Sequence, residues 1–299
     1  MKLPVRKEAL RNLSALLLLA GWSAVVWASG FPVTVTDELG REVTLAQEPG
    51  RIVSMLPSHS ETLCAIDACD KLVGVDDFSN YPPEVEQLPR LGGGLHGFDV
   101  EAIVELDPDL VVVSQFGELA GALEGLGLQV YAGSPQDLEH LFALFERLGT
   151  LVGRAREARQ LVDGVRSEIK VIEERTRGLE SPRVYFEIDP TPYSVGPDSF
   201  IGQAIALAGG ENIVGEDMGE FPQLDPEFVI AADPEVIVLG EHTDPDLEAR
   251  AGWADISAVA TGNVVQLSPG EGDIVSRPGP RFVEAVRLFA GIFHPEHFD

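Results

Sequence analysis

Residues 99–113 read DVEAIVELDPDLVVV, and residues 225–239 read DPEFVIAADPEVIVL. Aligned without a gap, both have D-x-E, an apolar run, D-P followed by Asp or Glu, and four apolar residues. The first aspartate favours a helix start, because its side chain accepts a free backbone N–H. Asp-Pro favours a helix end, because the residue before proline avoids the helical region. Each segment therefore predicts a short helix followed by a buried strand.

The surroundings of the two segments also repeat. Strands and helices alternate around each, and strands that are apolar throughout are typical of a parallel sheet covered on both faces. The first half predicts a hairpin at 33–45, strands at 51–58, 72–78 and 109–114, a helix capped by Ser58 or Ser60, and a helix at 99–106. The second half predicts strands at 183–188 and 263–268, a helix that begins at 199 and ends at the pair Gly209-Gly210, and a helix at 278–293. Capping alone would produce both aspartate motifs, but the repeated order favours two similar α/β lobes.

Between these halves the pattern becomes helical. From Pro135 to about Gly178 the chain is amphipathic, with charged residues on the outer face. A helix of about 24 residues would span about 36 Å, the width of a domain. We therefore predict an α/β fold with two βαβ lobes, parallel central sheets and a single long connecting helix. The lobes are expected at 29–152 and 181–299, with the interlobe helix at 153–180.

The first 28 residues have a different character. Four basic residues precede the apolar run ALLLLAGWSAVVWA, and Ala28 ends a plausible cleavage site. This layout predicts a signal peptide at 1–28 and an exported, periplasmic protein. An uncleaved membrane anchor is the alternative, because the run is only slightly short of a full span. No cysteine lies near the junction, which argues against a lipid anchor, and no later segment is long and apolar enough to span a bilayer.

The chain is strongly acidic. Its formal charge is −28, and residues 29–299 alone carry −31, because residues 1–28 hold four basic residues and one acidic residue. Such a surface repels nucleic acid and anionic lipid headgroups, so we predict neither as a partner. Most of the charge is expected to serve solubility.

The two cysteines, Cys64 and Cys69, stand in the segment CAIDAC. Outside the reducing cytoplasm they can form a disulfide. At this spacing they bridge only if the helix ends between them, so a disulfide and two buried thiols both remain open. The cysteine spacing fits no zinc pattern and the six histidines are scattered, so no metal site is predicted.

Seven pieces from Arg51 to the C-terminus occur in an order that resembles a known family. They are RIVSMLPSHSETL, LVGVDDFSNYPP, GFDVEAIVELDPDLVV, SPRVYFEI, ALAGGENIV, FPQLDPEFVIAADPEVIVL and SRPGPR. Together they resemble the class III periplasmic substrate-binding proteins of ABC importers for cobalamin, haem and ferric siderophores. SNYPP, G-x-D-x-E and FPQ are most similar to the cobalamin-binding member, whereas the hairpin at 33–45 looks more like siderophore-binding members.

The resemblance implies a monomer that captures cobalamin between its lobes and delivers it to a permease dimer with ATPase subunits. A ferric siderophore or haem is the alternative ligand, and no cofactor of the protein itself is implied. By the same resemblance the ligand-binding residues are Phe78, Tyr81, Leu95, His96, Tyr193, Phe221, Asp273 and Arg277. The sequence departs from the familiar cobalamin binder at Leu95, where a stacking tryptophan is lost. We expect His96 to form hydrogen bonds rather than to bind a metal.

The resemblance also gives the two repeated glutamates a role. In this family one glutamate on each lobe docks against arginines of the two permease subunits, and Glu101 and Glu227 stand at the matching positions. Each also lies in the first turn of its predicted helix, where the helix dipole stabilises a negative charge. One carboxylate can serve both purposes.

A cleft enzyme, such as a chelatase, is the alternative of another class. G-x-S-x-G, H-E-x-x-H and a Walker loop are all absent from the sequence. Asp273 and Arg277 would suit acid–base work, but no nucleophile accompanies them. The predicted export, the duplicated lobes and the paired glutamates favour capture and delivery instead.

Overall fold

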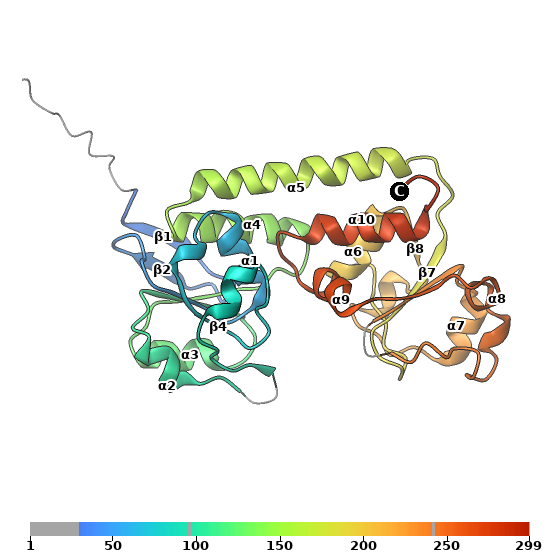
Figure 1. Cartoon of the computed structure of the whole chain (residues 1–299), viewed down its shortest axis with the longest axis horizontal. Coiled ribbons are helices and arrows are strands. Elements are labelled where there is room, and N and C mark those ends of the chain that lie inside the picture. The colour runs from blue at the N-terminus through green and yellow to red at the C-terminus, as the bar shows by residue number, and fades with distance from the viewer. Residues whose placement is uncertain (1–29, 95–96, 241–242, 299) are drawn as a thin grey trace, which may run out of the picture.

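The computed structural model describes residues 30–94, 97–240 and 243–298. Two α/β lobes lie side by side beneath one long helix, α5 (Ala155–Thr176), which confirms the predicted architecture (Figure 1). The predicted signal peptide at 1–28 lies outside the described residues, as do Leu95 and His96. Within the described part of the chain, no helix is both long and apolar enough to cross a membrane.

Each lobe is built on a four-stranded parallel sheet, and the two sheets have the same topology. The first sheet has the order β4 (Leu72–Val75), β3 (Ile52–Ser54), β5 (Leu110–Val113), β6 (Val130–Ala132). The second has the order β8 (Glu211–Asn212), β7 (Arg183–Glu187), β9 (Val236–Leu239), β10 (Val264–Gln266). In both lobes the first strand of the chain lies between the second and the third. The duplication indicated by the sequence is therefore a duplication of topology.

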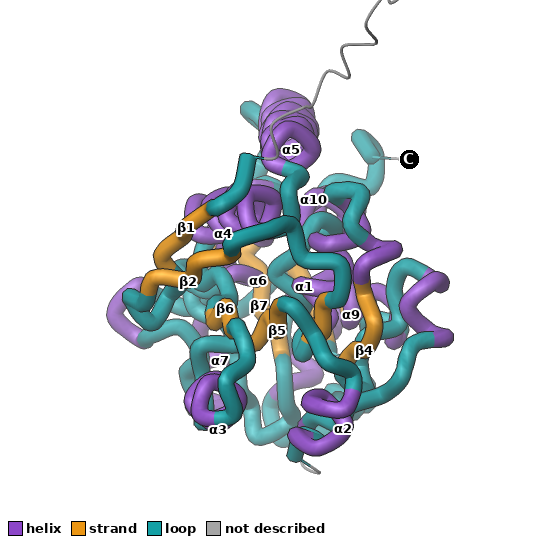
Figure 2. Tube along the Cα trace, turned by 90° about the vertical axis from the view of Figure 1, so that its left-hand side faces the viewer, coloured by secondary structure: helices purple, strands orange, loops and turns teal. Residues whose placement is uncertain are grey.

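Helices cover both sheets, and a hairpin of β1 (Val33–Thr36) and β2 (Glu42–Leu45) precedes the first. The first lobe contains α1 (Pro57–Ala65), α2 (Val100–Glu105), α3 (Leu119–Gly125) and α4 (Leu138–Leu151). The second contains α6 (Phe200–Leu207), α7 (Pro226–Ala232), α8 (Ser257–Thr261), α9 (Pro269–Ser276) and α10 (Phe282–Phe293). Figure 2, an end-on view, shows α5 lying outside α4 and α10.

The repeated segments fold alike. Asp99 caps α2 by accepting the amide of Ala102 at 2.9 Å, and Asp225 caps α7 by accepting the amide of Glu227 at 2.8 Å. Both caps confirm the prediction. After each helix the aspartate before proline adopts a left-handed conformation, with φ of 45° at Asp107 and 46° at Asp233. Left-handed aspartate is tolerated because its short polar side chain bonds locally, and it turns the chain into the strand.

An arginine at the start of each lobe's first strand anchors this turn. The Arg51 Nε donates to the carbonyl of Leu106 at 2.9 Å, and the Arg183 Nε donates to the carbonyl of Asp233 at 3.0 Å. The acidic residue after each Asp-Pro step makes a second contact, with the backbone of the same arginine. Asp109 accepts the backbone amide of Arg51 at 2.9 Å, and Glu235 accepts that of Arg183 at 3.0 Å. The repeated pattern therefore joins the third strand of each lobe to the first.

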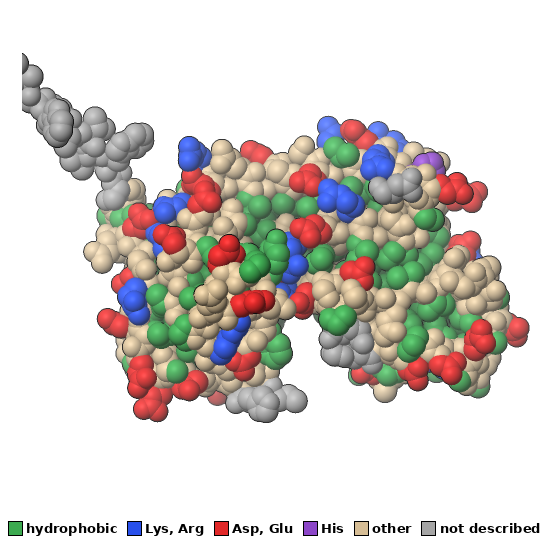
Figure 3. Space-filling model, viewed as in Figure 1, with side chains coloured by type: hydrophobic (Ala, Val, Ile, Leu, Met, Phe, Trp, Pro, Cys, Tyr) green, Lys and Arg blue, Asp and Glu red, His purple; other side chains and the backbone are tan. Residues whose placement is uncertain are grey.

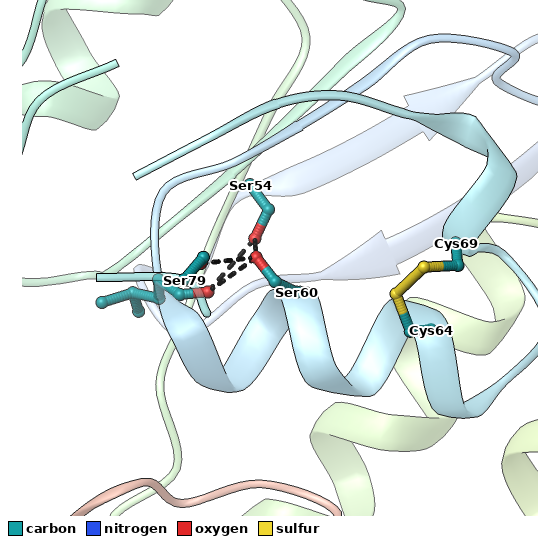
Figure 4. The surroundings of a disulfide bond; sticks show 6 residues. Ser54, Ser60, Cys64, Cys69 and Ser79 are labelled. Atoms are coloured by element: carbon teal, nitrogen blue, oxygen red, sulfur yellow. Dashed lines mark hydrogen bonds between the residues drawn. A yellow bond between two sulfur atoms is a disulfide. The ribbon is translucent and has the colours of Figure 1, made fainter. Parts of the chain in front are cut away.

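The predicted cap of α1 is wrong. The helix begins at Pro57 with Leu56 as its N-cap and without a side-chain cap, because proline suits the first helical position. Ser60 lies within the helix, where its hydroxyl bonds those of Ser54 and Ser79, each at 2.9 Å (Figure 4). It thus ties α1 to β3 and to the loop after β4.

Cys64 and Cys69 form a disulfide (Figure 4). The helix α1 ends at Ala65, between the two cysteines, which is the condition under which this spacing allows a bridge. The bond closes the turn that connects α1 to β4 at the edge of the first core.

The helix α4 contributes to the cores of both lobes. Leu141, Phe142 and Phe145 pack in a cluster with Val184 and Phe289 of the second lobe. The other side of α4 packs in the first lobe, through Leu144, Leu148 and Leu151. Apolar packing therefore continues from one lobe to the other beneath α5, and this continuity limits independent movement of the lobes.

Candidate ligand-binding cleft

A cavity of about 570 Å³ lies between the lobes. Figure 3 shows the surface hollowed at this place, on the side away from α5. The lining includes segments that follow the carboxyl ends of β5 and β6 in one lobe and of β7, β9 and β10 in the other. Ligands of α/β proteins bind outside the carboxyl ends of parallel strands, and the volume suits a small-molecule site.

Two exposed phenylalanines belong to opposite walls of the cavity. Phe116 of the first lobe is 65% exposed, and Phe221 of the second is 56% exposed. Exposed aromatic rings in a concave site are suited to a large apolar ligand. Phe221 was among the predicted residues, whereas Phe116 was missed. Its position directly after the predicted strand 109–114 is the signal that could have found it.

Phe78 lies against a glycine loop of the first lobe and is not among the described residues that line the cavity. Its ring is 56% exposed, and a β-carbon added to Gly94 would lie only 3.0 Å from its Cζ. Gly94 also has a positive φ of 57°, so glycine is favoured there on two grounds. The same loop leads to Leu95 and His96, which are outside the described residues.

Tyr193 lies beside the segment that carries Phe221. Its backbone bridges to Gln223, and the next amide, of Ser194, donates to the carbonyl of Pro222 at 3.0 Å. Its side chain is 41% exposed. Tyr193 and Phe221 therefore lie on neighbouring segments of the chain in the second lobe.

Arg277 is buried, and protein groups occupy its guanidinium. It donates to Glu61 at 3.0 Å, to the side chain of Asn80 at 2.7 Å, to the Phe78 carbonyl at 3.2 Å and to Asp273 at 2.6 Å. Asp273 lines the cavity and also accepts a hydrogen bond from the side-chain amide of Asn80 at 2.8 Å. Tyr81 is close by, with its ring 4.2 Å from the Arg281 guanidinium. The structure thus brings Phe78, Tyr81, Asp273 and Arg277 together where the lobes meet.

The charged groups of the cavity lining are acidic. Glu220 and Asp273 are its carboxylates, and no lysine or arginine is among the lining residues that the structure describes. Asp273 is paired with Arg277, whereas no ion pair joins Glu220 to any described residue. The described walls therefore combine apolar surface with hydrogen-bond acceptors.

Two buried titratable groups, His59 and Asp76, belong to the first lobe. Burial lowers the pKa of His59 to about 4. Neither ring nitrogen has a partner at hydrogen-bonding geometry. The nearby backbone of Gly133 therefore opposes this lowering of the pKa only weakly. Burial raises the pKa of Asp76, although its carboxylate accepts the Phe78 amide at 2.8 Å. Within the described ranges, no three or more His, Cys, Asp or Glu side chains are grouped to hold a metal ion.

Glu101 and Glu227 occupy matching positions in the two lobes. Both are exposed in the first turns of α2 and α7, and neither forms an ion pair with a described residue. Figure 1 shows both helices on the side of the molecule away from α5. The two carboxylates are thus presented to solvent on one side of the protein.

The family described as "Periplasmic binding protein" matches residues 52–270. The chain belongs to this family of binding proteins. A cobalamin-binding protein of Halobacterium salinarum is 33% identical over 282 residues, which cover 89% of this chain and 75% of that one. An uncharacterized ABC transporter substrate-binding lipoprotein of Bacillus subtilis, YvrC, is 31% identical over 280 residues, which cover 90% and 87%.

Solved structures share the fold of this periplasmic binding protein. The vitamin B12 binding protein BtuF of Vibrio cholerae has a TM-score of 0.69 at 24% identity, covering 82% of this chain and 96% of that one. The molybdate-binding MolA of Haemophilus influenzae has a TM-score of 0.75 at 21% identity, covering 89% and 92%. Proteins named for very different ligands have folds about equally similar to that of this chain. The fold therefore does not determine the ligand, and the residues of the cleft must determine it.

Proposed function

We propose that this protein captures a corrinoid, cobalamin, in the interlobe cleft and delivers it to an ABC importer. The observation that carries the proposal is a cavity of about 570 Å³ with Phe116 and Phe221 on opposite walls and acidic charged groups in its described lining. Two kinds of relatives support it, one named for cobalamin binding and one for ABC transport. Export by a signal peptide at 1–28 is part of the proposal.

The charge of the lining favours cobalamin over the alternative ligands. The corrin ring carries neutral amide side chains, whereas haem carries two propionates and many siderophores are anionic. Placing a carboxylate of the ligand near Glu220 without a cation costs free energy through repulsion and desolvation. An amide N–H can instead donate to Glu220 or to Asp273. The arginine that would suit an anionic ligand, Arg277, is already engaged.

Capture requires the two walls to hold a broad ligand between them. Phe116 and Phe221 would contact its apolar surface from opposite lobes. The shared packing of α4 and the span of α5 favour a small opening movement. Nothing in this arrangement requires a bond in the ligand to be broken, so the proposed role is capture rather than the chelatase alternative.

Delivery is assigned to Glu101 and Glu227. A permease dimer presents two equivalent surfaces, and a binding protein with two similar lobes can present one carboxylate to each. Exposed ion pairs contribute only about 0–1 kcal/mol each, so these contacts suit orientation and encounter rate more than raw affinity. We infer that the protein docks as a monomer on the permease, and that the ATPase subunits then drive release.

Titration of the purified protein with cyanocobalamin, haemin and a hydroxamate ferric siderophore tests the ligand. We expect saturable binding of cyanocobalamin at one site. Intrinsic fluorescence and visible absorbance measure this binding. Phe221→Ala should weaken this binding about 10- to 100-fold, since burying a phenylalanine contributes about 1.5–3 kcal/mol. Val171→Ala, at an exposed position of α5, should leave it unchanged. Binding of haemin alone, or of none of the three, would overturn the assignment.

A pair of corrinoids matched in size but different in charge tests the acidic lining. Hydrolysis of one peripheral amide of cyanocobalamin gives a monocarboxylate of nearly the same size but with one negative charge. We expect the wild-type protein to bind the monocarboxylate at least about tenfold more weakly than the amide, because it meets Glu220. Glu220→Gln should narrow this ratio, whereas Glu216→Gln, whose side chain does not line the cavity, should not. Equal affinities of the wild-type protein for both corrinoids would contradict the charge argument. Calorimetry gives the ratio directly.

A further inference from the structure

The carboxylate of Glu61 is the centre of a buried ionic cluster between the lobes. Its side chain is only 1% exposed, and it lies within α1. The Nη1 of Arg277 donates to its Oε1 at 3.0 Å. Arg281 donates to both oxygens, from Nε at 2.8 Å and from Nη2 at 2.6 Å. Both arginines belong to the second lobe, in the segment between α9 and α10.

Neighbouring groups extend the contact across the interface. From the first lobe, the Asn80 side chain bonds Arg277 at 2.7 Å and Asp273 at 2.8 Å, and the Phe78 carbonyl accepts from Arg277 at 3.2 Å. The backbones also come close, because a β-carbon added to Gly279 would lie 3.5 Å from the Ser58 Cα. Several hydrogen bonds therefore cross the interface. One side is formed by α1 and the loop after β4, and the other by the end of α9 and the residues that follow it.

The charges within the cluster balance. Arg277 and Arg281 carry two positive charges, and Glu61 and Asp273 carry two negative ones. The arginine side chains are 10% and 12% exposed, so bulk salt screens these pairs little. Removing one partner leaves a buried charge without compensation, which makes separation of the segments costly.

We propose that Glu61 is a positioning residue of an interlobe clamp, formed with Asn80, Asp273, Arg277 and Arg281, that sets the separation of the cleft walls. The helix α5 joins the lobes along one side, and the clamp joins them through different segments (Figure 1). Two separate connections restrict rotation about either one. The clamp also reaches the cleft itself, since Arg277 holds the carboxylate of Asp273, which lines the cavity.

The distance between the walls tests the clamp without any ligand. Spin labels on Glu118→Cys and Glu216→Cys report it by double electron–electron resonance. Both positions are exposed and lie close in sequence to Phe116 and to Phe221, on opposite walls. The native cysteines are joined in the disulfide and leave only the introduced thiols for labelling. In the labelled but otherwise wild-type protein we expect one narrow distance distribution.

Glu61→Gln should broaden this distribution and shift it to longer distances under conditions where circular dichroism shows the protein folded. Arg281→Gln removes the same pair from the other side and should act likewise, which keeps the test decisive if one variant does not fold. Glu168→Gln is the matched control, because it removes an exposed 2.6 Å pair with Arg287 that joins α5 to α10. It should leave the distribution narrow.

Unchanged distances in folded Glu61→Gln and Arg281→Gln would overturn the clamp, as would equal broadening in Glu168→Gln. A second readout rests on the proposed function. The dissociation rate of cyanocobalamin should rise at least about tenfold in Glu61→Gln, with a smaller change in the association rate, because the preformed cleft is lost. Failure of cyanocobalamin to bind the wild-type protein would reject the proposed ligand and leave the distance measurement to decide the clamp.

Discussion

Replacing both Glu101 and Glu227 by lysine is expected to abolish uptake of the ligand while leaving its binding affinity within about twofold. Each glutamate alone contributes little, but the double reversal replaces two attractions by two repulsions, and a like-charge contact at an interface costs several kcal/mol. Uptake is measured in cells that depend on this protein as their only binding protein for the importer, and affinity is measured on the purified variant.

The control for this experiment must match the change in net charge. Asp163→Lys with Glu173→Lys makes the same change on exposed positions of α5, on the side of the molecule away from α2 and α7. We expect normal uptake from this control. Single reversals should give intermediate uptake that falls further as ionic strength rises, because exposed pairs are screened by salt. Normal uptake by the Glu101 and Glu227 double variant would exclude docking through these two residues.

The duplicated fold could be predicted because its signals are local. The caps at Asp99 and Asp225 and the breaks at the two Asp-Pro steps act within a few residues of the chain, and both were confirmed. The cap of α1 was predicted wrongly for a related reason. Ser58 and Ser60 have the right chemistry, but Pro57 starts the helix earlier, and Ser60 finds its partners on β3 and on the loop after β4.

The cleft was harder to predict because its contacts join distant parts of the sequence. The bond from Arg277 to Glu61 spans 216 residues, and no local pattern shows that this arginine is spent on another side chain. Phe116 was missed because a single aromatic residue in a loop is ordinary until a second wall faces it. Family resemblance supplied candidate residues, and the structure divides them into residues that line the cavity, such as Phe221, and residues that hold the lobes together, such as Arg277.

Replacing Arg250 by alanine is expected to lower the free energy of unfolding by about 3–5 kcal/mol at neutral pH. Arg250 forms two bonds of 2.6 and 2.8 Å with Glu187, whose side chain is fully buried. Without this guanidinium, the Tyr185 hydroxyl, which donates at 2.9 Å, is the only side chain among the described residues that forms a hydrogen bond with the Glu187 carboxylate. Arg250 also lies over the Trp253 ring at 4.7 Å, so apolar contact is lost as well. Denaturant unfolding of the variant and of the wild-type protein measures the difference.

A double variant separates the contribution of charge from that of packing. Glu187→Gln removes the buried negative charge, so Glu187→Gln combined with Arg250→Ala should recover much of the stability that Arg250→Ala alone loses. No recovery in the double variant would assign the loss to packing alone. Glu187 ends β7 between Phe186 and Ile188, which both line the cavity, so the same pair that stabilises the second lobe also supports one wall of the cavity.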